Sequence, residues 1–216
     1  MGKEVNKESQ QHLEENVHAI DFYEKIPGKA QNAFVIFYAV DGKPYLNYEG
    51  VSSELRERAI PTCIMLMRDD GKMGFVGGRV EEGETLEEAA IREVSEEINA
   101  SGSFDLEPIV AHDIGTMTTH AFAAEVSYDA LLEMQKKAID AQHFGSEIVG
   151  VFLPHIIDFE EIYGNWGGIQ NIVQGAMAPS VREEFFHFLV KKNILPQSTL
   201  EGIAKKAGYS LSKLLG

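Results

Sequence analysis

The segment from Thr85 to Ile98 constrains the fold of this chain more than any other. It contains no Gly or Pro and many residues of high helix propensity, which predicts an α-helix. The acidic run 81–84 precedes it, where carboxylates are favoured by the positive end of the helix dipole. At about 100° per residue, Leu86, Ala89 and Ala90 fall on one stripe. We expect this stripe to face the protein interior.

Three glutamates, Glu93, Glu96 and Glu97, continue the apolar stripe. Their spacing gathers three carboxylates on one side of the helix, where they repel one another. A solvated acidic face would lie opposite the stripe, whereas these side chains point toward the body of the protein, where uncompensated charge is costly. Divalent cations supply the compensation. Because no Cys or closely spaced His pair joins the glutamates, the oxygen ligands favour Mg²⁺ or Mn²⁺ over Zn²⁺.

The letters around the glutamates form a longer pattern. Gly78 is followed by five residues, Glu84, seven residues and then Arg92-Glu93-Val94-Ser95-Glu96-Glu97-Ile98-Asn99-Ala100. This resembles the Nudix box, G-x5-E-x7-R-E-U-x-E-E-x-G-U, in which U is apolar. The departure is Asn99, where the family has Gly. That position ends the helix in a left-handed conformation, which Asn tolerates best after Gly, so we expect the fold to be kept.

The resemblance implies the Nudix fold, an α/β (α+β) architecture with a mixed β-sheet sandwiched between helices. It also implies metal-dependent hydrolysis of a nucleoside diphosphate linked to another group. In the family, metal ions activate water and neutralise charge on the diphosphate oxygens. The resemblance implies roles for six residues: Glu93, Glu96 and Glu97 as metal ligands, Arg92 paired with Glu84, and the carbonyl of Gly78 as a further ligand.

Similarity extends beyond the box to one subgroup, the inosine diphosphatases and snoRNA-decapping enzymes. Three further stretches carry this similarity, namely 64–75, 143–151 and 180–184. Together with the box, the similarity covers most of residues 32 to 195. In that subgroup the position of Glu147 supplies another carboxylate to the metal site. Arg68 corresponds to an arginine that contacts the substrate.

Two departures from the subgroup leave the base open. Phe34 stands where the subgroup has a base-contacting histidine, and Glu184 stands where it has a base-contacting glutamine. Phe34 could stack on a base, whereas an ionised Glu184 could only accept hydrogen bonds, which favours a ring that presents donors. His120 is a further candidate for substrate contact, with a structural role as the alternative. Trp166, in a Gly-rich loop, could stack on a base or pack in the core.

The rest of the chain predicts one domain. Residues 1–28 read as an N-terminal extension or arm with a weak helical pattern around Leu13 to Tyr23, and residues 29–216 as the Nudix domain with C-terminal helices. We expect the pair Gly77-Gly78 to break the sheet. The expected strands are 32–39, 45–48, 60–67, 73–76, 104–114, 116–126 and 148–153, and the further helices 128–141, 180–192 and 198–215, the last with a capping-box start at Ser198.

Composition limits the partners. The formal net charge of −15 over 216 residues argues against broad nucleic-acid binding. The one cysteine, Cys63, lies in an apolar run and should be buried, with no disulfide available. The N-terminus lacks a hydrophobic signal region and no apolar stretch reaches membrane-spanning length, so we expect a cytoplasmic protein without membrane contact.

Three functions stay open. The favoured one is Mg²⁺-dependent hydrolysis, with Mn²⁺ as a substitute, of a small nucleoside diphosphate, nucleotide sugar or ADP-ribose. The second is removal of an RNA cap, which needs a basic track that the scattered lysine pairs do not provide. The third is a catalytically silent module. The C-terminal segment should lie on its own domain, with the arm of a homodimer as the alternative.

Overall fold

The computed structural model describes residues 17–43, 53, 57–157 and 168–216, and it contains two sheets. A six-stranded mixed sheet has the order β1-β7-β8-β2-β3, with β6 also pairing with β2, and a three-stranded sheet has the order β5-β4-β9. The strands are β1 (His18–Ile20), β2 (Ala30–Ala39), β3 (Thr62–Cys63), β4 (Met65–Arg68), β5 (Met73–Gly74), β6 (Val76–Arg79), β7 (Glu107–Asp113), β8 (Met117–Glu125) and β9 (Ile148–Phe152).

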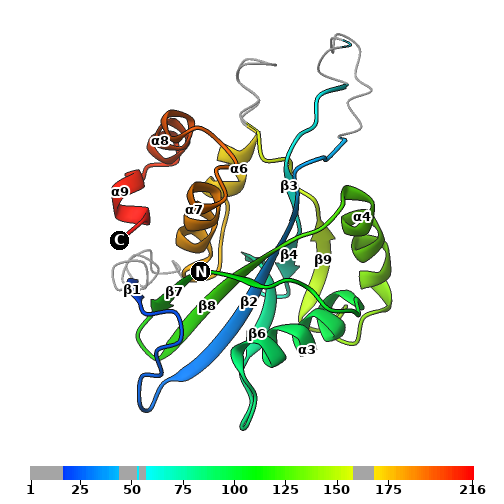
Figure 1. Cartoon of the computed structure of the whole chain (residues 1–216), viewed down its shortest axis with the longest axis vertical. Helices are drawn as coiled ribbons and strands as arrows, with labels where there is room; N and C mark the ends of the chain where they lie inside the picture. The colour runs from blue at the N-terminus through cyan, green and yellow to red at the C-terminus, as the bar shows by residue number, and fades with distance from the viewer. Residues whose placement is uncertain (1–16, 44–52, 54–56, 158–167) are drawn as a thin grey trace, which may run out of the picture.

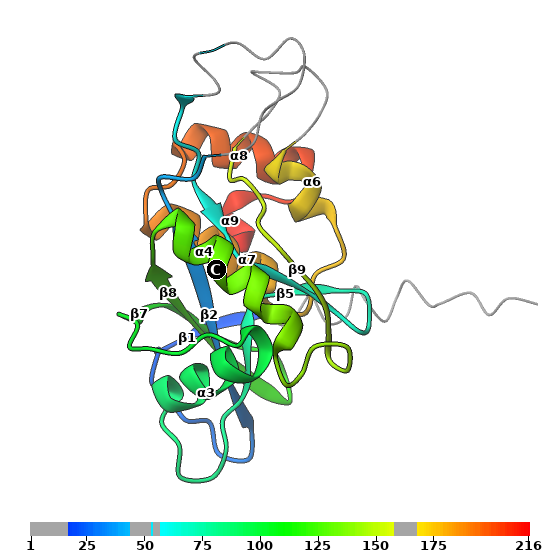
Figure 2. The ribbon, with the colours of Figure 1, turned by 90° about the vertical axis from the view of Figure 1, so that its right-hand side faces the viewer.

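Helices cover both faces of the larger sheet, so the predicted α/β sandwich is confirmed (Figures 1 and 2). One face carries α3 (Leu86–Ile98) and α4 (Tyr128–Lys137), which a short 3-10 helix, η1 (Ala138–Asp140), follows. The opposite face carries the later part of the chain, namely α6 (Ile169–Gln174), α7 (Val181–Lys191), α8 (Gln197–Lys206) and α9 (Leu211–Leu214).

The centre of the sheet is the parallel pair β2 and β8. Side chains alternate along β2: Val35 and Phe37 join the core beneath α3 and α4, whereas Ile36 and Tyr38 join the core beneath α7. A strand covered on both faces needs apolar residues at successive positions. This explains why β2 has no alternating polar residues from Ala33 to Ala39.

Three expectations about the strands were wrong. The segment 73–76 is not one strand, because the chain passes at Phe75 from β5 in the smaller sheet to β6 in the larger one. The segment 60–67 forms two strands, because the chain leaves β3 in the larger sheet at Ile64 and enters β4 in the smaller one. The pair Gly77-Gly78 does not break the sheet but lies inside β6, opposite Phe34 and Ala33 of β2. Gly77 has a φ of 145°, and a Cβ atom there would collide with the carbonyl of Ala33.

The two ends also differ from expectation. In place of a weak helix near Tyr23, β1 pairs with β7, so this part of the expected N-terminal arm belongs to the sheet. The expected strand 45–48 lies outside the described residues. The segment 198–215 forms two helices, and α8 begins after Pro196 without a side-chain cap, so the capping box at Ser198 was wrong. The short helix α6 was not predicted.

The C-terminal helices lie on their own domain. Leu200, Ile203 and Ala204 of α8 and Leu211 and Leu214 of α9 are buried in the core that α7 shares. Cys63 is buried and unpaired, as predicted. Within the described ranges, no helix is both long and apolar enough to cross a membrane.

Candidate active site

The helix α3 has defined ends that fix where its glutamates lie. The Thr85 side chain accepts a hydrogen bond from the N–H of Glu88, whose side chain in turn accepts from the N–H of Thr85. At the other end, Asn99 adopts the left-handed conformation that was predicted for it, with φ 51° and ψ 37°. The apolar stripe is buried in the core, and it carries Glu93 and Glu97 inward with only 8% and 5% of their surface exposed.

The two glycines of β6 bring the strand against these carboxylates. The N–H of Gly77 donates to Oε2 of Glu97 at 2.8 Å. A Cβ atom on Gly78 would lie 2.5 Å from Oε1 and 2.7 Å from Cδ of Glu93, a distance that real side chains do not tolerate. The absence of a side chain at Gly78 therefore lets the carboxylate of Glu93 occupy this position.

Arg92 ties the loop before α3 to the glutamates. Its Nε lies 2.9 Å from Oε1 of Glu84, and its Nη2 donates to the carbonyl of Arg79 at 2.8 Å. Its Nη1 lies 2.8 Å from Oε1 of Glu93 and 2.9 Å from Oε2 of Glu96. The pairing of Arg92 with Glu84 that the resemblance implied is present. One guanidinium thus holds three carboxylates in fixed positions.

The charges around Glu97 leave it short of positive partners. The pKa of Glu97 is raised to about 8, mainly by burial and also by the carboxylates of Glu93 and Glu147, against the opposing effect of the Gly77 N–H. The pKa of Glu93 is also raised, mainly by burial, although Arg92 opposes this. Buried oxygen ligands that disfavour their own ionisation fit a divalent cation, which would supply the missing charge.

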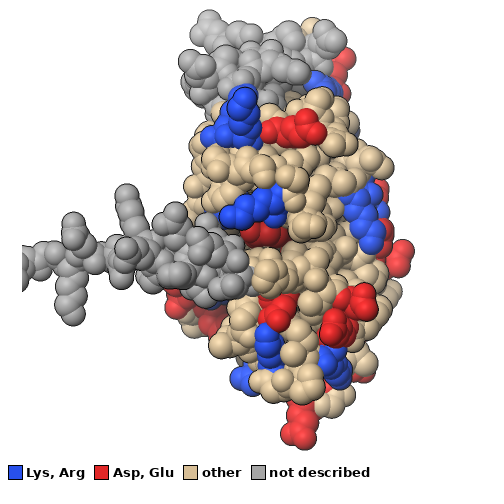
Figure 3. Space-filling view, turned by 90° about the vertical axis from the view of Figure 1, so that its left-hand side faces the viewer, with Lys and Arg blue, Asp and Glu red and all other residues tan. Residues whose placement is uncertain are grey.

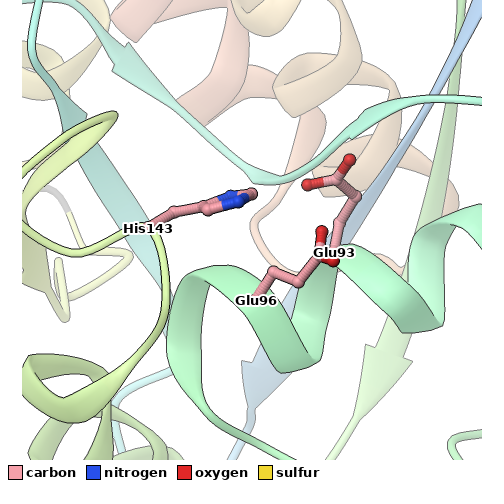
Figure 4. A group of neighbouring side chains, drawn as sticks. All are labelled: Glu93, Glu96 and His143. Carbon is pink, nitrogen blue, oxygen red and sulfur yellow. The ribbon is translucent and has the colours of Figure 1, made fainter.

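A histidine that the sequence did not single out as a ligand joins the glutamates. His143 lies in the loop between η1 and β9, and its ring points toward Glu93 and Glu96 (Figure 4). Ligand atoms of the three residues all lie within 4.8 Å of one another. The same loop carries Glu147, which lines the cleft at the site. No sequence spacing could have found His143, because the loop approaches α3 only through the tertiary fold.

The glutamates face a cleft of about 790 Å³. Phe34, Arg68, Gly78 and Glu147 line it, so four of the predicted binding and ligand positions lie around one space. Arg68 is 44% exposed and pairs with Asp70 at 3.3 Å, which leaves its guanidinium near the cleft rim. Thr119 and the segment 178–179 close another part of the wall.

Two predicted substrate contacts do not lie on this cleft. Glu184 is fully buried in α7, where Ser180 Oγ donates to its Oε1 at 2.8 Å, and its carboxylate also interacts with the side chain of the wall residue Thr119. His120 is also fully buried and points to the α3 side of the sheet, where its Nδ1 lies 2.6 Å from the carbonyl of Phe22. Neither side chain lines the cleft in this structure. Trp166 lies outside the described residues.

Comparison with known proteins places these observations in a family. The family model for Nudt16-like proteins, described as U8 snoRNA-decapping enzyme-like, matches residues 31–195. A U8 snoRNA-decapping enzyme from Homalodisca vitripennis is 39% identical over 93 residues, which cover 40% of this chain and 50% of that protein. The chain thus matches about half the length of this relative.

Solved structures of Nudix proteins are more distant. A mutT/nudix family protein from Listeria innocua matches with a TM-score of 0.49 and 19% sequence identity. The match covers 80% of this chain and 100% of the Listeria chain. The NUDIX domain of Shewanella oneidensis NrtR, solved with ADP ribose, matches with a TM-score of 0.48 and 13% sequence identity. The match covers 79% of this chain and 91% of the NrtR chain. The family match, which spans well over half of the 216 residues, is decisive, and the chain belongs to the Nudt16-like family of Nudix hydrolases.

Proposed function

We propose that this protein hydrolyses the diphosphate bond of a nucleoside diphosphate derivative with Mg²⁺ or Mn²⁺. The observation that carries this proposal is the set of buried carboxylates, headed by Glu97 with its pKa raised to about 8, at the edge of an open cleft. Buried carboxylates with raised pKa values that line a cleft are typical of functional sites. Glu93, Glu96, Glu97, Glu147 and the carbonyl of Gly78 would hold the metal.

The residues of the chain position the reacting groups. Arg92 fixes the carboxylates of Glu93 and Glu96, and the N–H of Gly77 fixes Glu97. A bound divalent ion supplies positive charge that activates water and offsets the charge of the diphosphate. Arg68 at the rim offers a guanidinium to phosphate oxygens, to which it could bind with two parallel hydrogen bonds.

The cleft suits a nucleotide in size and lining. Its volume of about 790 Å³ is in the range of small-molecule sites. The ring of Phe34 lines the wall on the α7 side of the sheet and could stack on a base. Because Glu184 and His120 are buried away from the cleft, we assign neither of them a substrate contact in this conformation.

A direct assay tests the proposal. The protein is incubated with Mg²⁺ or Mn²⁺ and a panel of nucleoside diphosphates, nucleotide sugars, ADP-ribose and dinucleoside polyphosphates, and the products are identified by mass. We expect cleavage at a diphosphate bond, and a loss of several orders of magnitude on replacing Glu97 by Gln. The matched control is Glu133→Gln on the exposed face of α4. Absence of cleavage of the whole panel with both ions would exclude this function.

RNA decapping is the second candidate, and the family match and the Homalodisca relative favour it. The net charge of −15 opposes it. On the face drawn in Figure 3, Lys and Arg lie in small groups among Asp and Glu and form no continuous basic track. Capped RNA therefore belongs in the same panel, and cap release faster than cleavage of any small substrate would make decapping the main activity.

Three further expectations are tested by other means. A catalytically silent module would show the same low background for the wild type and for Glu97→Gln. A homodimer would be seen by analytical ultracentrifugation, and a chain cut after Gln197 would remain dimeric if α8 and α9 take no part. A cytoplasmic location would be tested by fractionation.

A further inference from the structure

The cluster of Glu93, Glu96 and His143 joins two segments that are distant in sequence. The two glutamates project from α3, and the histidine projects from the loop before β9 (Figure 4). Their ligand atoms lie within 4.8 Å of one another, close enough to meet on one ion. The proposed function above uses the carboxylates but gives the imidazole no role.

Main-chain hydrogen bonds fix His143 against the helix. Its N–H donates to the carbonyl of Glu96 at 2.9 Å, which anchors the loop to the last turns of α3. Its carbonyl accepts the N–H groups of Glu147 at 3.1 Å and Ile148 at 3.2 Å. These contacts fix the backbone of His143 beside the last turns of α3 and also position the segment that carries Glu147.

The ring nitrogens of His143 lack the partners that a purely structural histidine would have. Its Nδ1 is inaccessible to solvent and finds no hydrogen-bond partner in the described part of the chain. Its Nε2 lies 3.4 Å from the amide nitrogen of Gln142, a long contact at the limit for a hydrogen bond. Most buried polar atoms are satisfied, so an unpartnered imidazole nitrogen beside two carboxylates points to a ligand.

We propose that His143 is a nitrogen ligand of the divalent ion held by Glu93 and Glu96. The inference rests on the proposed function only in that both need a bound metal ion. Mg²⁺ prefers oxygen ligands alone, whereas imidazole suits first-row transition ions. His143 thus gives the site a stronger preference for Mn²⁺ over Mg²⁺ than oxygen ligands alone would give.

Electron paramagnetic resonance of the Mn²⁺-loaded protein tests this coordination directly. Electron spin echo modulation from a coordinated imidazole nitrogen is expected in the wild type and should disappear in His143→Gln. The matched control is His18→Gln, which removes an exposed histidine on β1 and should leave the modulation unchanged. Absence of nitrogen modulation in the wild type, or its persistence in His143→Gln, would overturn the proposal.

Metal affinity gives a second measurement. In a titration, free Mn²⁺ is measured by its electron paramagnetic resonance spectrum. His143→Gln should weaken Mn²⁺ binding by about tenfold or more, since even the loss of a residue behind the ligands lowers metal affinity by about 10- to 100-fold. Mg²⁺, measured by competition, should weaken less, so the ratio of the two affinities falls. An equal loss for both ions would contradict a nitrogen ligand.

The test of nitrogen coordination and the hydrolysis assay can give independent results. Neither measurement uses turnover, so nitrogen coordination without cleavage of any diphosphate would uphold the role of His143 and refute the proposed function. Cleavage without nitrogen coordination would uphold the proposed function and refute the role of His143.

Far-ultraviolet circular dichroism and thermal unfolding of His143→Gln show whether a loss of Mn²⁺ comes from unfolding. A variant Glu96→Gln, which keeps His143, should retain the modulation at saturating Mn²⁺.

Discussion

The carboxylate of Glu93 occupies the space in which a side chain on Gly78 would lie. A Cβ atom there would be 2.5 Å from Oε1 of Glu93. Moving the Glu93 carboxylate away would break the contact between the same oxygen and Nη1 of Arg92 at 2.8 Å. The strand β6 and the helix α3 are thus fitted to each other at the proposed metal site.

The first prediction concerns this fit. Replacing Gly78 by Ala should displace the carboxylate of Glu93 and lower hydrolysis by about 10²-fold, the loss expected when a group at the reaction site shifts by about 1 Å. Steady-state kinetics with the best substrate of the panel measures it. The control Gly150→Ala lies on β9, where a Cβ would meet Met67 at an ordinary 3.6 Å, and should keep its activity. Equal activity of the Gly78→Ala and Gly150→Ala variants would refute the role of the close approach.

The second prediction concerns Arg92. Lys at this position keeps the charge but cannot reach Glu84, Glu93 and the Arg79 carbonyl together. Arg92→Lys should lower the free energy of unfolding by about 1–3 kcal/mol, the range for hydrogen bonds to charged groups, as measured by urea denaturation. Lys137→Met, which breaks an exposed ion pair with Glu133, should cost less than about 1 kcal/mol. Equal effects of the two substitutions would argue against a special role of Arg92.

The third prediction concerns the pH dependence of stability at Glu184. Burial raises the pKa of Glu184 from 4.5 to about 7 in the folded protein. As the pH falls from about 7 toward 4.5, the folded state takes up this proton before the unfolded state does, so this group then favours folding more. Above pH 7 the buried carboxylate is charged and opposes folding. Glu184→Gln should therefore stabilise the protein by about 1–3 kcal/mol at pH 8 and by nothing near pH 4.5.

Urea denaturation across that range measures the difference. Ser180 can still donate to the Oε1 of Gln at position 184, so the hydrogen bond at 2.8 Å need not be lost. Glu201→Gln, on the exposed side of α8, is the control and should show no comparable gain at high pH. A gain at pH 8 that persists unchanged at pH 4.5 would mean that better packing, and not ionisation, is the cause.

The fourth prediction concerns the pH dependence of metal binding. The pKa of Glu97 is raised to about 8, so much of the metal-free protein carries a proton there at neutral pH. A cation must displace this proton, so Mg²⁺ affinity should rise between about pH 6 and pH 9. Calorimetry in buffers of different ionisation enthalpy should detect proton release, and Glu97→Gln should release less. Affinity that does not change over this range would contradict the raised pKa.

The sequence predicted those features that local chemistry determines. The helix Leu86–Ile98 follows from propensity, its end at Asn99 follows from the left-handed conformation that Asn tolerates, and the inward direction of Glu93 and Glu97 follows from helical periodicity. The role of Gly77 and Gly78 was misjudged. Glycine usually interrupts a strand, but here the close approach of β2 requires it at position 77 and the close approach of Glu93 on α3 requires it at position 78.

Features that depend on distant segments were not predictable. His143 meets Glu96 only because the loop before β9 returns to the end of α3, and no spacing in the sequence records that contact. In the same way, the burial of Glu184 depends on how α7 packs against Thr119 of β8, which the subgroup resemblance alone did not reveal. In both cases the residue type indicated what the side chain could bind, but the contacts made by distant segments determined whether it lies at the cleft.

The parallel pairing of β2 with β8 has a consequence for how the protein folds. Phe34 lies opposite Ala121 in this pair, so a long stretch of chain, including α3, must close before the two central strands meet. Parallel pairing over such a separation is slow, whereas a capped helix forms in microseconds or less. During synthesis, α3 with its glutamates would emerge before β8, and the cleft wall formed by Phe34 and Thr119 would be completed only after β8 had left the ribosome.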